Sequence, residues 1–337
     1  MRKLARLVSV AVIAVTFALF SAAFVMVFLG DPAFAPAPAP TPEAIASFMA
    51  RFAQPYPAIA RRFRMRDGVT LNARVFPADS RATIVLVHGV LESSLPLNRT
   101  AGLLREAAGA NVVAIDLRGH GESGGAPGDV SYIGQYEDDL ADVVTQVRAG
   151  EPEGRVLLAG HSMGGGVALR FAQKGGMPHV DGYLLFAPHL GPRSPTTPQE
   201  TTSAGASFVQ IHLPRILGLA FFNGVGITTF NGLHTLFFNL PRELPLRSYS
   251  YRAMAGMCPS DHVPALRAIH EPLLVIVGSK DEAFHADRYD AAVRPHGRGE
   301  VVVVPGASHD GVLDDPRAMA AVHLWMPAAA GAVPGRL

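Results

Sequence analysis

The chain has 337 residues, with 29 lysine and arginine side chains, 28 acidic ones and a formal net charge of +1. This balance leaves no excess of basic groups for nucleic acid, so we expect no nucleic-acid partner. The single cysteine, Cys258, cannot form an internal disulfide, so the fold does not depend on crosslinks. The length suits one domain with an insertion.

The N-terminal region differs in composition from a soluble domain. Three basic side chains precede an uncharged, mostly apolar stretch over residues 7–30, which as a helix would reach about 36 Å and could cross a bilayer. A secretory signal peptide is the alternative, but its apolar region is typically about 7–15 residues long. The nearest small-residue site, Ala33 to Ala35, is followed by Pro36, which disfavours cleavage.

We therefore predict a retained, single-pass membrane anchor over 7–30, followed by a stiff spacer rich in proline and alanine. The upstream positive charges would keep residues 1–6 in the cytoplasm and place the rest on the extracytoplasmic side. Only three of the 29 basic side chains are lysine, and alanine is abundant, which indicates a bacterium with GC-rich coding. The predicted location is thus the bacterial inner membrane.

The segment Gly160-His161-Ser162-Met163-Gly164 lies between an apolar run over 156–159 and a stretch of helical periodicity over 167–172. Glycines two residues before and after a serine are typical of a sharp strand-to-helix turn that presents the hydroxyl as a nucleophile. The first N–H groups of the helix would face the group that the serine attacks. A plain helix cap would need no such glycines.

Further apolar runs end in residues suited to the same chemistry. The run from 82 ends at His88-Gly89-Val90, the run from 273 leads to Asp281, and the run from 301 leads to His309. Another run, from 112, leads into a glycine-rich loop. Serine, acid and histidine in this order, each just after a strand, match the chain order of an α/β-hydrolase triad. Strands alternating with helices indicate a mainly parallel sheet.

With the hairpin over 66–71 and the loop over 116–123, these motifs resemble the α/β-hydrolase superfamily over residues 61–325. Within it, the chain is most similar to the monoacylglycerol lipase and lysophospholipase-like branch, which is also serine aminopeptidase-like. The resemblance implies an α/β fold: a mostly parallel central sheet, helices on both faces and an inserted cap. In the loop, Asp116 and Arg118 are interpreted as ordering residues and candidates for an internal ion pair.

The chemistry assigns a role to each site residue. Ser162 would be the nucleophile, His309 its general base, and Asp281 the acceptor that orients the imidazole. The neighbouring Glu282 competes for the acid's role, and the resemblance favours Asp281. The backbone N–H groups of Met163 and, by resemblance, Val90 would stabilise the oxyanion. The other histidines lack the spacing of metal ligands, so no metal or cofactor is expected.

The insertion over 192–266 should contain the cap. Residues 201–240 carry one formal charge, Arg215, and many large apolar side chains. Many of these side chains must pack the cap onto the core, and we predict that the others line an acyl pocket or touch the bilayer. The predicted substrate-binding residues are Phe221, Phe222, Phe237 and Phe238. Polar residues between Asn223 and Asn231 argue against a second membrane span.

The predicted function is a membrane-anchored serine hydrolase that cleaves carboxylic esters of lipid type, such as a monoacylglycerol or a lysophospholipid. Alternatives on the same fold are a proline-type aminopeptidase, a thioesterase and a small-ester esterase; the non-enzymatic alternative is a catalytically inactive, membrane-tethered binding protein. The predicted segments are the cytoplasmic N-terminus (1–6), anchor (7–30), linker (31–55), N-terminal core segment (56–191), cap (192–266), C-terminal core segment (267–328) and tail (329–337).

Overall fold

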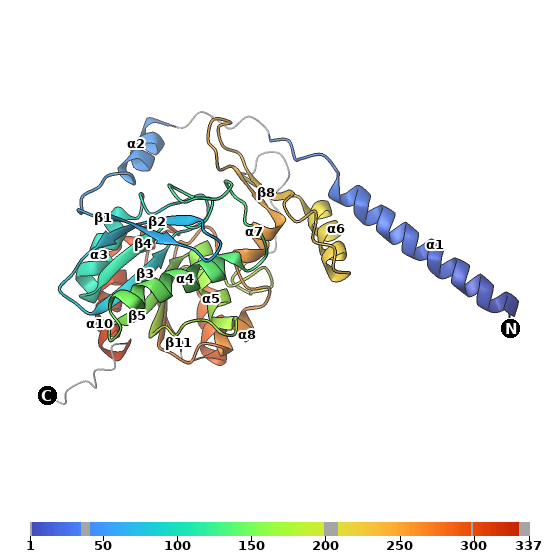
Figure 1. Cartoon of the computed structure of the whole chain (residues 1–337). Coiled ribbons are helices and arrows are strands. Elements are labelled where there is room, and N and C mark those ends of the chain that lie inside the picture. The colour runs from blue at the N-terminus through green and yellow to red at the C-terminus, as the bar shows by residue number, and fades with distance from the viewer. Residues whose placement is uncertain (1, 35–40, 199–207, 298, 330–337) are drawn as a thin grey trace. The chain divides into compact units, whose positions relative to one another are not determined.

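The computed structural model describes residues 2–34, 41–198, 208–297 and 299–329. These residues form two compact units (Figure 1). The larger unit combines the described residues of 39–200 and 255–337, and the smaller one combines those of 1–38 and 201–254.

The larger unit is built on an eight-stranded sheet in the order β1-β2-β4-β3-β5-β6-β10-β11. Only the β1–β2 and β2–β4 pairs are antiparallel. The strands are β1 (Ile59–Arg64), β2 (Thr70–Phe76), β3 (Ala82–Val87), β4 (Asn111–Ile115), β5 (Arg155–His161), β6 (Gly182–Phe186), β10 (Leu273–Gly278) and β11 (Gly299–Val304). This mostly parallel sheet confirms the predicted α/β-hydrolase fold.

Helices cover both faces of the sheet (Figure 1). α3 packs against α10, whereas α5 packs against α4 and α8. The helical elements of this unit, with the connection α7 at its boundary, are α2 (Pro42–Ala50), α3 (Asn98–Ala108), α4 (Gln135–Gly150), α5 (Met163–Gln173), α7 (Tyr251–Gly256), α8 (His262–Arg267), η1 (Ala286–Arg288), α9 (Tyr289–Val293), η2 (Arg294–His296), η3 (Gly311–Leu313) and α10 (Pro316–Ala329).

The burial of each strand follows from this layering. Every residue of β6 and β10 is buried, because helices cover both faces of a central parallel strand. β11 lies at the edge of the sheet, and its Val303 is 42% exposed. Parallel strands point their carboxyl ends to one edge, which is where α/β folds bind ligands. The segments after β3, β5, β10 and β11 therefore meet at that edge.

The smaller unit combines the N-terminal apolar helix with residues of the insertion, two segments that the sequence places far apart. It contains α1 (Arg2–Val27), β7 (Val209–Ile211), α6 (Leu213–Gly224), β8 (His234–Phe238) and β9 (Ser248–Ser250). The three strands form an antiparallel sheet in the order β7-β8-β9. α1 packs against α6, and Ala23, Val27, Leu219 and Phe222 are buried between them.

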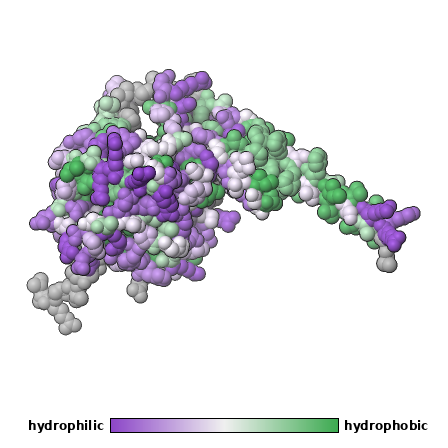
Figure 2. All heavy atoms as spheres, in the orientation of Figure 1, coloured by the Kyte–Doolittle hydropathy of each residue, from purple (hydrophilic) through white to green (hydrophobic). Residues whose placement is uncertain are grey.

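Within the described residues, α1 is the one helix long and apolar enough to cross a membrane, a test that a signal sequence also passes. Figure 2 shows apolar side chains along its length and hydrophilic ones at its N-terminal end. At about 1.5 Å per residue, its 26 residues reach about 39 Å.

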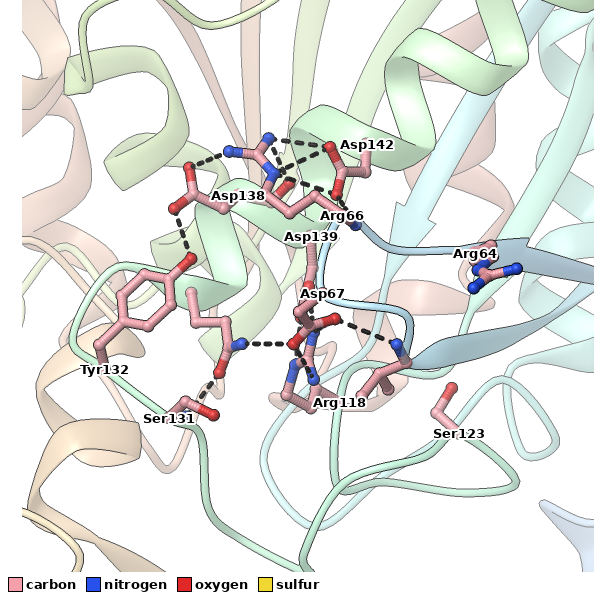
Figure 3. Close-up of polar contacts among 12 residues, drawn as sticks. Arg64, Arg66, Asp67, Arg118, Ser123, Ser131, Tyr132, Asp138, Asp139 and Asp142 are labelled. Carbon is pink, nitrogen blue, oxygen red and sulfur yellow. Dashed lines mark hydrogen bonds and ion pairs between the residues drawn. The ribbon is translucent and has the colours of Figure 1, made fainter.

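Arg118 and Asp116 order the loop after β4, but they do not pair with each other. The Arg118 guanidinium binds Asp139 of α4 at 2.7 Å and Asp67 of the β1–β2 turn at 2.9 Å (Figure 3). Asp116 instead accepts backbone N–H groups from Ser94 at 2.6 Å and Glu122 at 2.9 Å. These contacts support the predicted role of both residues in ordering the loop. The predicted ion pair of Arg118 is present, but its partners are Asp139 and Asp67 and not Asp116, because α4 packs over the loop.

This network predicts that substitutions of two aspartates of α4 differ strongly in their effect on the free energy of unfolding. Asp139→Asn removes the negative charge that pairs with Arg118, and both side chains are under 5% exposed. The free energy of unfolding should therefore fall by about 3 kcal/mol. Asp142→Asn affects a pair with Arg66, which is 52% exposed, and should cost about 1 kcal/mol or less. Urea unfolding of both variants measures the difference. Equal losses of stability in the two variants would contradict a stabilising role for the buried Arg118–Asp139 ion pair.

Candidate active site

Ser162 lies at the turn between β5 and α5 in a strained backbone conformation. Its φ of 51° and ψ of −114° fall outside the regions that residues with a side chain usually adopt. It is formally the N-cap of α5, yet its side chain makes no capping hydrogen bond. The hydroxyl is therefore not engaged as a helix cap, and the conformation fits the predicted turn.

Two glycines permit this turn by close packing. A Cβ on Gly160 would lie 2.4 Å from the backbone of Gly164, and a Cβ on Gly164 would lie 2.3 Å from the carbonyl oxygen of Val87. Both distances are far below van der Waals contact with atoms that cannot move aside. The strand, the helix and β3 approach one another this closely only because both positions lack a side chain.

Asp281 and His309 come together although they lie 28 positions apart in the sequence. The Oδ2 atom of Asp281 lies 2.9 Å from Nδ1 of His309. The other oxygen, Oδ1, accepts the backbone N–H groups of Ala283 and Phe284, each at 2.8 Å. The Asp281 side chain is fully buried. Its carboxylate is thus fixed in position and orientation before it meets the imidazole.

Glu282, the competing acid, has another role. Its Oε2 atom accepts the backbone N–H of His309 at 3.0 Å, so it holds the loop rather than the imidazole ring. The structure therefore brings Asp281, and not Glu282, to the ring nitrogen of the predicted base.

His309 lies beside the serine turn even though β6 and β10 separate β5 from β11. The ring of His161, the residue before Ser162, lies 4.7 Å from the ring of His309, centroid to centroid. Its Nε2 atom also lies 3.2 Å from the carbonyl oxygen of His309. Phe284 packs edge-on against the same imidazole at 5.4 Å. The loop after β11 must therefore reach back across two strands to the serine turn.

The predicted oxyanion donors are the backbone N–H groups of Met163 and Val90. Met163 is the first residue of α5, and Val90 lies in the turn after β3. Among the hydrogen bonds of the described residues, none uses either N–H group. A Cβ on Gly89 would lie 3.5 Å from Cβ of Ser162, so the turn after β3 packs directly against the serine. Both donors are thus available close to Ser162.

Glu92 is a site residue that sequence reasoning missed. Its Oε2 atom accepts the N–H of Gly89 at 3.1 Å and lies 3.7 Å from Nδ1 of His161, an ion-pair distance rather than a hydrogen bond. The other oxygen pairs with the guanidinium of Arg51. The available signal was an acid three residues after His88-Gly89, in a turn with no other charge.

The charges around Glu92 shift two pKa values. Burial alone would raise the pKa of Glu92, but His161 and Arg51 outweigh it and lower the pKa to about 2. Burial alone would likewise lower the pKa of His161, yet Glu92 and Asp310 raise it. The carboxylate thus stays ionised at neutral pH and connects the turn after β3 to the serine turn.

His161, His309 and Asp310 present ligand atoms within 4.8 Å of one another, the spacing of a metal site. Both imidazoles already have partners, since Nδ1 of His309 binds Asp281 and Nε2 of His161 lies near a carbonyl oxygen. A cation here would occupy a ring nitrogen of the predicted base. We therefore assign no metal to this cluster.

The four phenylalanines predicted to bind substrate all belong to the smaller unit. Phe221 and Phe222 pack against Phe20 of α1, with ring centroids 5.2 Å and 6.0 Å away. Phe238 is buried and packs against Tyr249 at 6.0 Å, and Phe237 is half-buried. Contact with α1 accounts for the burial of Phe222 and the partial burial of Phe221. Their role in substrate binding stays a prediction.

Comparison with known proteins agrees with this architecture. Residues 78–222 match the Hydrolase_4 family, described as serine aminopeptidase S33. A monoacylglycerol lipase of Mycolicibacterium smegmatis is 32% identical over 96 residues, covering 28% of this chain and 34% of that lipase. The chain thus spans about a third of the length of the curated relatives it matches.

Two solved structures share the fold. The monoacylglycerol lipase of Paleococcus ferrophilus has a TM-score of 0.55 and 23% identity, covering 77% of this chain and 99% of that one. A membrane phospholipase A, a bacterial virulence factor, has a TM-score of 0.56 and 18% identity, covering 98% and 99%. The chain thus has the α/β-hydrolase fold, and part of it is similar to the serine aminopeptidase S33 family and to a monoacylglycerol lipase, in line with the motifs.

The interaction between Glu92 and His161 predicts that the stability of the fold depends on pH. Because the pKa of Glu92 falls from 4.5 to about 2 on folding, its contribution is present above pH 4.5 and is lost as the pH falls toward 2, up to about 3 kcal/mol. The raised pKa of His161 acts in the opposite sense, so its share is present below pH 6.5 and is lost as the pH rises through the folded pKa. The loss of unfolding free energy caused by Glu92→Gln should therefore be largest between about pH 4.5 and pH 6.5.

Urea unfolding between pH 3 and pH 8 measures this profile. The difference in unfolding free energy between the native chain and Glu92→Gln should be largest near pH 5–6 and shrink toward pH 3. Glu151→Gln, at a 47% exposed side chain, is the matched control and should show little difference at any pH. A penalty for Glu92→Gln that does not change with pH would contradict the ion pair.

Proposed function

We propose that this α/β-hydrolase cleaves carboxylic esters through Ser162. The observation that carries the proposal is the buried carboxylate of Asp281, which two backbone N–H groups fix and which binds His309 at 2.9 Å beside the serine turn. A carboxylate in this position sets the imidazole tautomer and stabilises the imidazolium that forms during catalysis. Such an arrangement activates a serine hydroxyl.

The proposed reaction has two stages. In the first stage His309 takes the proton of Ser162 as the hydroxyl attacks the ester carbonyl, and the alcohol leaves with that proton. The N–H groups of Met163 and Val90 stabilise the oxyanion, each contributing about 3 kcal/mol. In the second stage His309 activates a water molecule that hydrolyses the acyl-enzyme, which releases the acid and restores Ser162.

The proposed substrate carries an apolar acyl chain, as in a monoacylglycerol or a lysophospholipid. The similar proteins include a monoacylglycerol lipase, and the similar folds include a membrane phospholipase A. The insertion is strongly apolar, with one formal charge in residues 201–240. An insertion with so little charge favours a lipid ester over a small, water-soluble one.

We also propose that α1 is retained and anchors the enzyme in the bacterial inner membrane. The helix is long and apolar enough to cross a bilayer, and its basic residues at the N-terminal end favour a cytoplasmic N-terminus. The catalytic unit would then lie on the extracytoplasmic side. The mass of the protein extracted from membranes should equal 35.6 kDa, whereas cleavage of a leader would reduce it.

Labelling with a fluorophosphonate tests the nucleophile. The full chain in detergent should be labelled and lose ester hydrolysis, while Ser162→Ala should show neither labelling nor turnover. Asp281→Asn should retain the fold and lower kcat about 10⁴-fold because the imidazole adopts the wrong tautomer. Glu282→Gln, which keeps an oxygen to accept the backbone N–H of His309, is the control at the adjacent position and should retain kcat. An unlabelled native protein would favour the inactive binding protein instead.

A substrate panel tests the acyl preference. Monoacylglycerols and long-chain p-nitrophenyl esters should be hydrolysed with higher kcat/KM than acetyl esters or a proline p-nitroanilide. The measurement is initial rate against concentration for the full chain in mixed micelles. A clear preference for short esters would reject the lipid assignment, and cleavage of the anilide would establish the aminopeptidase.

A further inference from the structure

α6 runs back along the C-terminal half of α1. Gly218 packs at the point of closest approach, because a Cβ there would lie 2.6 Å from the carbonyl oxygen of Ala23 and 2.8 Å from Val27. One turn further along α6, Phe222 meets Phe20 of α1. Small residues at the crossing point are typical of helices that associate in membranes, since they let two backbones approach closely.

Arg215, at the start of α6, binds the C-terminal end of α1. Its Nε atom donates to the carbonyl oxygen of Val27 at 2.9 Å, and its Nη2 atom donates to that of Leu29 at 2.6 Å. Nη1 donates to the carboxylate of Asp31 at 2.7 Å and to the carbonyl oxygen of His234 at 2.6 Å. The guanidinium thereby satisfies carbonyl groups that a helix end leaves free, and its charge suits the negative end of the helix dipole.

The opposite face of α6 carries no charge. Leu213 and Leu217 are 55% and 51% exposed, and Ala220 on the same face is also exposed. Arg215, the sole formal charge of residues 208–240, is buried against α1. Water would not favour a surface helix with apolar side chains on both faces. The exposed face of α6 is continuous with the apolar surface of α1, so lipid is the partner that fits both.

The polar side chains at the end of α6 form their hydrogen bonds with one another. Asn223 and Asn231 exchange two amide hydrogen bonds of 2.7 Å and 2.8 Å, and Asn223 also donates to the carbonyl oxygen of Leu219. Amides paired in this way lower the cost of apolar surroundings. Arg215 and Phe222 are seven residues apart, so α6 extends about 10 Å along α1, roughly a third of a bilayer core.

We infer that α6 is a membrane-inserted helix, lying beside α1 in the outer half of the bilayer with acyl chains against Leu213, Leu217 and Ala220. This inference rests on the proposed anchoring by α1. It assigns α1 a second role, because the same helix that crosses the membrane also forms the core of the smaller unit. The insertion of this α/β-hydrolase is thereby held in the lipid layer.

Site-specific depth measurement tests the inference in the full chain. In a Cys258→Ala background, a single cysteine at Leu217 carries an environment-sensitive fluorophore, and the protein is reconstituted in phosphatidylethanolamine and phosphatidylglycerol vesicles. Phe17→Cys on α1 is the positive control for the anchor, and Leu324→Cys, at a 79% exposed position of α10, is the aqueous control. Quenching by spin-labelled lipids and by aqueous iodide reports depth.

We expect the label at residue 217 to be quenched at least threefold more by lipid spin labels than by iodide, with the order reversed at residue 324. Ala220→Cys, on the same face of α6, provides a second position should the first variant fold poorly. Lipid quenching at residue 17 with only aqueous quenching at 217 and 220 would overturn the inference and leave the anchor intact. Aqueous quenching at all these positions would overturn both.

A second pair of variants tests the packing between the helices. Gly218→Val should push α6 away from α1 and shift the label at residue 217 toward the aqueous quencher, while the label at residue 17 remains in lipid. Gly224→Val, at a position of the same helix with open space around it, is the matched control and should change neither label. An unchanged depth in Gly218→Val would contradict insertion through α1.

Discussion

The close contact between Gly160 and Gly164 is the constraint on which the geometry of the candidate site depends. It lets β5 and α5 meet within a distance that no side chain would permit, and it forces Ser162 into a positive φ. The chain accepts this strain because the surrounding strands fix the turn on every side. One consequence is that Ser162 directly precedes the first N–H of α5, at the end of β5.

The remaining parts of the site are fixed by charges and hydrogen bonds rather than by strain. Two backbone N–H groups orient Asp281, which in turn orients His309, and Glu92 ties the turn after β3 to His161. The Asp281–His309 contact links the segments after β10 and β11, and the Glu92–His161 contact links the segment after β3 to the end of β5. The relative positions of the parallel strands therefore set the distances between the side chains of the candidate site, and a shift of one strand would separate them.

The N-terminal helix and the insertion are interdependent. Arg215 supplies the positive charge for the end of α1, and Gly218 provides the space for its backbone. Removal of residues 2–31 would take away three of the four acceptors of the buried Arg215 guanidinium and expose Leu219 and Phe222. This explains how an insertion with so little charge remains folded: its apolar residues have the N-terminal helix, besides one another, to pack against.

Much of the fold and of the candidate site can be predicted from the sequence, because the patterns that indicate them each lie within one short segment. The glycine–serine turn, the apolar runs before Asp281 and His309, and the uncharged stretch over 7–30 each occupy one short segment, so spacing and composition predict the fold, the family and the candidate triad. The partners of Arg118, the place of Glu92 beside His161, and the pairing of α1 with α6 were decided by the tertiary structure. Those contacts join residues tens to nearly two hundred positions apart, and their geometry is set by how packed elements approach, which no local pattern encodes.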